Sequence, residues 1–263
     1  MTALGDYPEI AIDIDDWIAT VEIQRPPLNY FHVGLIGALA DAFEALDTEP
    51  SCRVIILCSE GKVFCAGAEL SSSSDDPSPT AGPRGSGHLY EEAVRLFRTR
   101  TPVVAAVQGA AVGGGFGLAM MPDFRVACPE ARFSANFARL GFHQGFGLSV
   151  TLPAGVGHQT ALDMFYTGRR VKGEEALSLG LCDRLVPKNE LRSAAREFAT
   201  EIARSAPLAV DSIRRTMRGD LAERVRVATD RELAEQDRLR QTDDFKEGVQ
   251  AMSERRLPNF SGS

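Results

Sequence analysis

The sequence predicts an α/β fold in which buried strands end in glycine turns and lead into helices, followed by a helical C-terminal region. The theme of an apolar run, a glycine turn and a helix recurs at 54–67, 102–115 and 132–145. The apolar runs are short and continuous, which is typical of strands buried on both faces. Beyond about residue 157 the apolar positions have helical spacing. Together these observations favour a coil of strand–strand–helix units with a helical tail.

The N-terminal segment has a different pattern. Apolar residues alternate with polar ones from residue 10 to residue 23, on both sides of the acidic pair Asp15-Asp16, and this predicts a β-hairpin. The other predicted elements of this half are a helix over 33–46, a mobile Ser/Pro/Gly-rich loop over 71–87, a helix from near His88 to before Thr101, and short strands at 124–128 and 131–135.

The C-terminal part is expected to consist of helices over 190–204 and 208–218 and a charge-rich helical stretch over about 221–256. We therefore divide the chain into a core of residues 1–200 and an oligomerisation region of residues 201–263. An amphipathic tail of this kind needs a partner surface, so a homo-oligomer is expected.

Composition excludes several classes of protein. Of the 263 residues, 44% are hydrophobic and 25% charged, so a globular core is expected. The net charge of −7 argues against a nucleic-acid partner, because phosphate backbones are bound by clustered Lys and Arg. The five cysteines are widely spaced and form no C-x-x-C pair, so we expect no disulfide framework, no metal site and a cytoplasmic location. No secretory signal or apolar run of about 20 residues predicts a membrane association.

Two glycine turns carry the candidate chemistry. Gly67 follows the strand that begins at Val54, and Gly113-Gly114-Gly115 follows the next buried strand and opens a helix. Glycine permits backbone conformations that other residues avoid, and a helix start presents N–H groups without acceptors. Neither turn has the spacing of a dinucleotide-binding or Walker A motif. Taken singly, each turn is also explained by packing alone.

Five segments, in order, resemble the crotonase superfamily, which is the enoyl-CoA hydratase/isomerase family. They are RPPLN at 25–29, VIILCSEGKVFCAGAEL at 54–70, TPVVAAVQGAAVGGGFGLAMMPDFRVA at 101–127, ARFSANFARLGFHQGFG at 131–147 and DDFKEGVQAMSERRLPNF at 243–260. The resemblance implies a crotonase-like spiral of strand–strand–helix repeats with a C-terminal helical trimerisation region. It also implies a homotrimer or a dimer of trimers, an acyl-CoA thioester substrate, and no cofactor other than the coenzyme A of that substrate.

By this resemblance, the backbone N–H groups of Ala68 and Gly114 form an oxyanion hole. A thioester carbonyl gains negative charge when its α-carbon is deprotonated or its β-carbon is attacked, and two preorganised N–H donors lower that barrier. The alternative is two turns with a structural role only.

The resemblance also assigns contacts with coenzyme A and the acyl group. The adenine is expected against the backbone near Ala66. Arg25 is a candidate for a phosphate contact, and the C-terminal segment of a neighbouring subunit is expected to supply Met252 and Arg255. The remaining substrate contacts implied by the resemblance are Gly67, Leu70, Gly113 and Phe137.

The chain departs from the family at its acid/base positions. Enoyl-CoA hydratases carry two glutamates at positions that are Gly117 and Phe137 here, and a third position used as an aspartate in some relatives is Gly145. Neither glycine nor phenylalanine transfers protons. His143, next to Gln144, is a candidate replacement because imidazole titrates near neutral pH. A packed histidine explains His143 equally well. Tyr90 is a second candidate, for which a core or pocket-wall tyrosine is the better explanation.

The expected function is therefore that of an acyl-CoA enzyme of the hydratase/isomerase type, a lyase or an isomerase such as those of fatty acid metabolism. The missing glutamates leave alternatives open. These are thioester hydrolysis, decarboxylation, C–C cleavage, a silent acyl-CoA-binding subunit, and hydrolysis of a β-diketone without coenzyme A.

Overall fold

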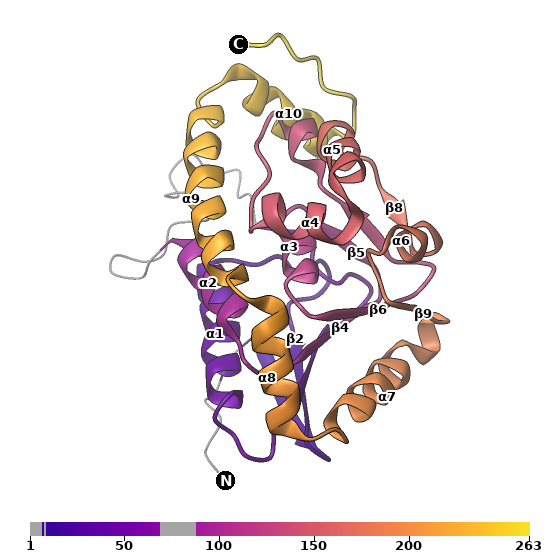
Figure 1. Cartoon of the computed structure of the whole chain (residues 1–263). Helices are drawn as coiled ribbons and strands as arrows, with labels where there is room; N and C mark the ends of the chain where they lie inside the picture. Colours follow the sequence, from indigo (N-terminus) through magenta and orange to yellow (C-terminus); the bar gives the residue numbers. More distant parts are fainter. Residues whose placement is uncertain (1–6, 8, 69–87) are drawn as a thin grey trace.

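The computed structural model describes residue 7 and residues 9–68 and 88–263 (Figure 1). The expected loop at 71–87 and the expected substrate contact of Leu70 lie outside these residues. The hairpin, the helix at 33–46 and the buried strands that the sequence predicts are all present.

Two sheets form the frame of the molecule. The larger sheet has the order β1 (Ile10–Asp15), β2 (Ile18–Ile23), β3 (Val54–Ser59), β4 (Val103–Val107), β6 (Phe124–Ala127) and β9 (Arg184–Leu185). Only the β1–β2 hairpin is antiparallel, and every later pair in this sheet is parallel. The smaller sheet consists of β5 (Ala110–Val112), β7 (Arg132–Ser134) and β8 (Val171–Lys172).

The central strands β3 and β4 of the larger sheet are buried on both faces, as their continuous apolar runs predict. In β3, Val54 and Ile56 pack against α7 (Leu191–Ala203), whereas Ile55 and Leu57 face the main core. Side chains alternate between faces along a strand, so a strand between two helical layers has no polar position. α7 meets the sheet through Leu191 and three alanines at four-residue steps, so small side chains bring the helix close to the sheet.

The described helices surround this frame. They are α1 (Val33–Leu46), α2 (Leu89–Arg98), α3 (Gly114–Met120), η1 (Asn136–Leu140), α4 (Leu148–Val156), α5 (His158–Thr167), α6 (Gly173–Leu179), η2 (Lys188–Glu190), α7, α8 (Pro207–Arg218), α9 (Leu221–Leu239) and α10 (Asp243–Glu254). The expected helical stretch over 221–256 consists of two helices, α9 and α10. The chain breaks between them, and the hydroxyl of Thr242 accepts a hydrogen bond from Phe245 N at 3.1 Å and caps the start of α10.

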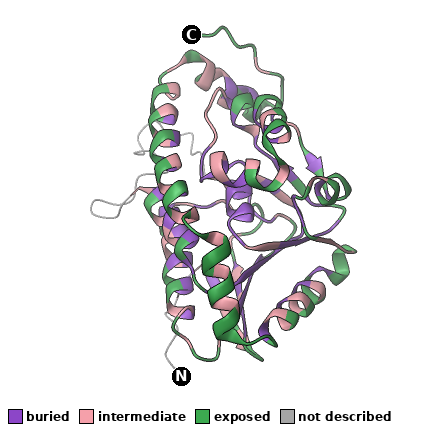
Figure 2. Ribbon diagram, viewed as in Figure 1, coloured by how far each residue is buried: buried purple, intermediate pink, exposed green. Residues whose placement is uncertain are grey.

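The C-terminal helices differ in how they meet the core. α8 has no buried residue (Figure 2). It is held by ion pairs of Arg214 and Arg218 with Asp123, at 2.9 and 2.8 Å. α9 packs against α2 and α4 and buries Val225 and Gln236 in the same chain (Figure 1). The region predicted for oligomerisation therefore also completes the core of its own chain. No described helix has the length and apolarity that crossing a bilayer requires.

Candidate functional site

The residues that the sequence predicts as oxyanion donors meet at one place. Ala68 and Gly114 both line a small pocket with a volume of about 50 Å³. Its other described lining residues are Phe31, Leu89, Tyr90, Phe137, Phe142, Phe146, Gln236 and Arg240. The pocket is therefore mainly aromatic, and among these described residues none carries a carboxylate.

The first glycine turn is positioned by short parallel strand contacts. Cys65 N donates to Ala110 O at 3.0 Å, Val112 N donates to Cys65 O at 3.0 Å, and Phe31 N donates to Gly67 O at 2.9 Å. Gly67 has a φ of 103°, and a side chain there would lie 2.9 Å from the carbonyl oxygen of Val112. Only glycine fits this approach, which carries the chain to Ala68.

The second glycine turn presents the other N–H group. Gly113 N donates to Ser134 O at 2.9 Å, and its φ of 56° turns the chain into α3. Gly114 is the first residue of that helix, so its N–H has no acceptor within the helix. A Cβ at Gly114 would lie 2.5 Å from Cζ of Phe31, and a Cβ at Gly115 would lie 2.2 Å from Cys65 O. An added Cβ would therefore force the Phe31 ring to move at Gly114 and would meet backbone at Gly115.

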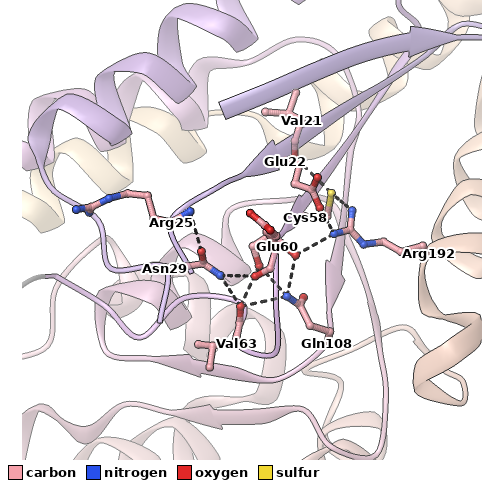
Figure 3. Close-up of polar contacts among 10 residues, drawn as sticks. Val21, Glu22, Arg25, Asn29, Cys58, Glu60, Val63, Gln108 and Arg192 are labelled. Carbon is pink, nitrogen blue, oxygen red and sulfur yellow. Dashed lines mark hydrogen bonds and ion pairs between the residues drawn. The ribbon is translucent and has the colours of Figure 1, made fainter. Parts of the chain in front are cut away.

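A buried polar network fixes the loop that leads to Ala68 (Figure 3). The Asn29 amide donates to Glu60 O at 2.8 Å and to Val63 O at 2.7 Å, and its oxygen accepts from Arg25 N at 3.1 Å. Gln108 donates to the same Val63 oxygen at 3.1 Å. Asn29 is fully buried, so an unmet hydrogen bond here would be costly. The sequence offers this asparagine only as a motif letter, without indicating its positioning role.

The positions of the missing carboxylates are occupied by aromatic groups. A Cβ at Gly117 would lie 2.6 Å from Cβ of Phe146, and a Cβ at Gly145 would lie 1.9 Å from the hydroxyl oxygen of Tyr90. Phe137 lines the pocket and is 8% exposed. The positions expected to carry carboxylates are thus a pocket-lining phenylalanine and two glycines that pack against Phe146 and Tyr90.

Tyr90 is the candidate acid/base residue that does reach the pocket. Its hydroxyl donates to Oε1 of Gln236 at 2.8 Å, and Nε2 of Gln236 donates to His143 O at 2.9 Å. Burial, followed by the nearby charge of Glu232, raises the pKa of Tyr90 well above its usual value. The residue is a neutral phenol whose proton is directed at Gln236.

His143, the other candidate, is placed differently. Its Nδ1 lies 2.8 Å from Gln144 O, and its side chain is not among the described residues that line the pocket. The side-chain amide of Gln144 donates a hydrogen bond to Ser149 Oγ at 3.2 Å. What His143 contributes on the pocket side is its backbone carbonyl, which fixes Gln236.

A polar row runs along α9 to its C-cap, and two of its members, Gln236 and Arg240, line the pocket. Glu232, Gln236 and Arg240 follow one another at four-residue steps and so share one helix face. The Glu232 carboxylate accepts from Gly147 N at 2.9 Å and from Ser149 N at 3.0 Å, which anchors the start of α4. Sequence reasoning missed this row because charged residues in a charge-rich helix predict a solvated surface.

The expected coenzyme A contacts are spread over separate surfaces. Ala66 N donates to Leu28 O at 3.0 Å beside the first turn. Arg25 pairs with Glu9 at 2.6 Å and lines an open hollow at the N-terminal motif. Met252 and the α10 C-cap residue Arg255 are exposed and are not among the described residues that line the aromatic pocket.

Cys65 lies directly beside the first turn but is not a candidate nucleophile. Its side chain is fully buried, and burial raises the pKa of its thiol to about 12. A thiol with this pKa carries almost no thiolate at neutral pH.

Comparisons with known proteins identify the family and the fold. The model of the enoyl-CoA hydratase/isomerase family matches residues 13–263. A carnitinyl-CoA dehydratase of Salmonella arizonae is 35% identical over 252 residues, covering 93% of this chain and 95% of the relative. The structure of an enoyl-CoA hydratase/isomerase from Pseudoalteromonas atlantica T6c superposes with a TM-score of 0.86 at 29% identity, over 96% of this chain and all of that one.

An enoyl-CoA hydratase structure from Mycobacterium avium subsp. paratuberculosis gives a TM-score of 0.84 at 28% identity, over 97% of this chain and all of that one. These matches confirm the predicted crotonase-like α/β fold. The chain belongs to the enoyl-CoA hydratase/isomerase family of the crotonase superfamily.

Proposed function

We propose that this protein binds an acyl-CoA thioester and stabilises its enolate form with the backbone N–H groups of Ala68 and Gly114. The observation that carries the proposal is that both residues line one small aromatic pocket. In a water-poor site, each such donor contributes about 3–4 kcal/mol to stabilising a developing oxyanion. Cys65, Gly67 and Gly113 supply the close backbone packing that keeps the donors in place.

The first candidate reaction is of the hydratase/isomerase type. Family membership supports it, as does the similarity to proteins named carnitinyl-CoA dehydratases. Such reactions move a proton at the α-carbon, and the usual carboxylates are replaced by Gly117 and Phe137. Among the described lining residues, Tyr90 carries the one hydroxyl, so the proposal assigns the proton transfer at the α-carbon to this phenol.

A second candidate is favoured by the lack of a carboxylate among the described residues of the pocket. A thioester with a carboxylate on its α-carbon reaches the same enolate by losing CO2. The electrons of the broken C–C bond move to the α-carbon and the thioester oxygen, and water supplies the proton afterwards. This route needs the oxyanion hole but no general base.

Assembly and coenzyme A binding follow the same proposal. The exposed positions of Met252 and Arg255 suit contacts with coenzyme A bound to a neighbouring subunit, in a homotrimer or a dimer of trimers. α8 supports the idea of such assembly, because Leu208, Ile213 and Met217 are 84%, 62% and 80% exposed. No cofactor besides the coenzyme A of the substrate is required by this chemistry.

The test is turnover of an acyl-CoA panel. Purified protein is incubated with crotonyl-CoA, longer and aromatic enoyl-CoAs, and malonyl-type CoA esters, and products are identified by mass spectrometry. A gain of water or a shifted double bond supports the first candidate, and loss of CO2 supports the second. Tight binding of CoA esters without any product would contradict both and leave a silent binding subunit.

A further inference from the structure

Phe31 contacts both glycine turns of the pocket, and neither the resemblance nor the proposed reaction gives it a role. Its backbone N–H donates to Gly67 O at 2.9 Å, and the residue forms a parallel β-bridge with Ala68. Its ring lies against the other turn, because a Cβ added at Gly114 would be 2.5 Å from Cζ of that ring. One residue thus binds the first turn through its backbone and meets the second turn through its side chain.

The segment that carries Phe31 is fixed on both sides. Before it, the buried side chain of Asn29 donates to two carbonyl oxygens of the loop at 60–63, at 2.8 and 2.7 Å. After it, His32 caps α1, with Nδ1 accepting a hydrogen bond from Leu35 N at 3.3 Å. The backbone position of Phe31 is therefore set by contacts outside the two turns.

The ring of Phe31 packs in turn against that of Phe146. The ring centres lie 5.4 Å apart with an angle of 46° between the ring planes, and both residues are 1% exposed. Phe146 has a φ of 60°, a left-handed backbone conformation that is unfavourable for a bulky residue. Such a conformation persists only where the surrounding packing imposes it. The two rings therefore form a fixed support beside Gly114.

The direct hydrogen bond between the two turns lies away from the N–H donors. Val112 N donates to Cys65 O at 3.0 Å, which fixes positions three residues before Ala68 and two residues before Gly114. A glycine with positive φ lies in each interval, and glycine leaves the backbone more freedom than other residues do. Phe31 supplies a contact at the donors themselves.

We propose that Phe31 is a positioning residue of the oxyanion hole, which keeps the N–H groups of Ala68 and Gly114 at a fixed separation before a ligand binds. The inference rests on the proposed function, because the ring has this role only if both N–H groups bind one oxygen. Preorganised donors stabilise a developing charge without rearranging, and a misplacement of about 1 Å costs on the order of a hundredfold in rate. A neutral thioester carries less charge on its oxygen and gains less from the same alignment.

The experiment compares enolate binding with ester binding in Phe31→Leu. Leucine keeps the backbone N–H that binds Gly67 O but lacks the ring atom that meets Gly114. Acetoacetyl-CoA reports the enolate through the pH at which the bound ligand ionises, followed by near-ultraviolet absorbance. Butyryl-CoA reports the neutral ester by isothermal titration calorimetry. We expect the ionisation pH of bound acetoacetyl-CoA to rise by about one unit or more, which is a tenfold loss of enolate preference. The affinity for butyryl-CoA should change by less than about threefold.

Two further variants locate the effect. Phe43→Leu makes the same change at a fully buried phenylalanine of α1 that is not among the described residues lining the pocket, and it should leave the ionisation pH unchanged. The double variant Phe31→Leu/Gly114→Ala places a methyl group in the space that the ring leaves, and it should recover part of the wild-type value. A general loss of stability would not produce this recovery.

The outcomes separate this inference from the proposed function. If Phe31→Leu ionises the ligand at the wild-type pH, or Phe43→Leu causes an equal rise, the role of Phe31 is wrong while the oxyanion hole stands. If the wild-type protein does not lower the ionisation pH of acetoacetyl-CoA, the proposed function fails and this inference fails with it. Phe146→Leu decides the question should Phe31→Leu not fold. It removes the ring on which Phe31 packs, so we expect a smaller rise, and an unchanged ionisation pH would overturn the proposal.

Discussion

The two walls of the pocket are built in opposite ways. The wall with Ala68 and Gly114 consists of backbone packed so closely that a single added carbon would lie 2.2–2.9 Å from its neighbours at Gly67, Gly114 and Gly115. The opposite wall consists of long side chains, Tyr90, Gln236 and Arg240, joined by hydrogen bonds and ring contacts. The backbone wall can serve any thioester, whereas the side-chain wall can distinguish one acyl group from another. The predictions below test this division of roles.

The largest effect on stability is expected when a glutamate is placed at position 117, where hydratases carry a carboxylate. Gly117→Glu places a Cβ 2.6 Å from Cβ of Phe146 and buries a charge, so we expect a loss of about 3 kcal/mol or more in the free energy of unfolding. Urea denaturation measures it. Gly155→Glu, at an exposed helical glycine whose Cβ would meet only the mobile end of Met120, is the matched control and should cost less than about 1 kcal/mol. A stable Gly117→Glu protein would show that the aromatic wall is adaptable.

The next largest effect on stability is expected from the hydrogen bonds of Asn29, which hold the loop of the backbone wall in place. Asn29→Ala removes the donor to Glu60 O and Val63 O and the acceptor of Arg25 N, and should cost about 2–3 kcal/mol of stability. Gln108→Ala should cost less, because Val63 O keeps its hydrogen bond from Asn29. Chemical denaturation together with acyl-CoA affinity checks both variants. Unchanged affinity in a folded Asn29→Ala protein would contradict a positioning role.

Glu232, which is buried on α9 one turn before Gln236, gives a smaller effect on stability that depends on pH. Burial raises the pKa of this carboxyl above its unfolded value of about 4.3, so the folded state takes up the proton first. Its contribution to stability is therefore greatest below about pH 4 and declines as the pH rises through the raised pKa. Glu232→Gln cannot titrate and turns an NH2 group toward one backbone N–H. We expect it to be less stable by about 1–2 kcal/mol at acid pH, with a smaller difference at pH 8.

Denaturation curves of both proteins across this pH range check the prediction. A difference that grows as the pH rises would mean that the ionised carboxylate is the form favoured by folding, and that its two backbone donors outweigh burial.

The smallest effect is expected at His143. Its ring contacts Gln144 O and is not among the described residues that line the pocket, so His143→Ala keeps the backbone carbonyl that fixes Gln236. We expect acyl-CoA affinity and turnover to change by less than about threefold. A loss of a hundredfold or more in turnover, with affinity retained, would restore His143 as an acid/base residue.

The glycine turns of the backbone wall can be predicted from the sequence because their requirements are local. Gly67 and Gly114 stand at turns after apolar runs, and a turn that excludes a Cβ admits one residue type. The side-chain wall depends on packing between segments far apart in sequence. Tyr90 meets Gln236 across 146 positions, and nothing in a charge-rich helix distinguishes Gln236 or Arg240 from its solvated neighbours. For the same reason the direction of the His143 ring could not be predicted.

The most direct test of the account uses acetoacetyl-CoA, whose enolate absorbs in the near ultraviolet and forms without an enzymatic base. If the N–H groups of Ala68 and Gly114 bind an enolate oxygen, the bound ligand ionises at lower pH than the free ligand. Gly114→Pro removes one donor at the first helical position, where proline is tolerated, and Gly114→Ala makes the same Cβ contact with Phe31 but keeps the N–H. We predict that the pH shift persists in the alanine variant and is largely lost in the proline variant. A bound ligand that ionises at the same pH as free acetoacetyl-CoA, or a shift equal in both variants, would contradict the account.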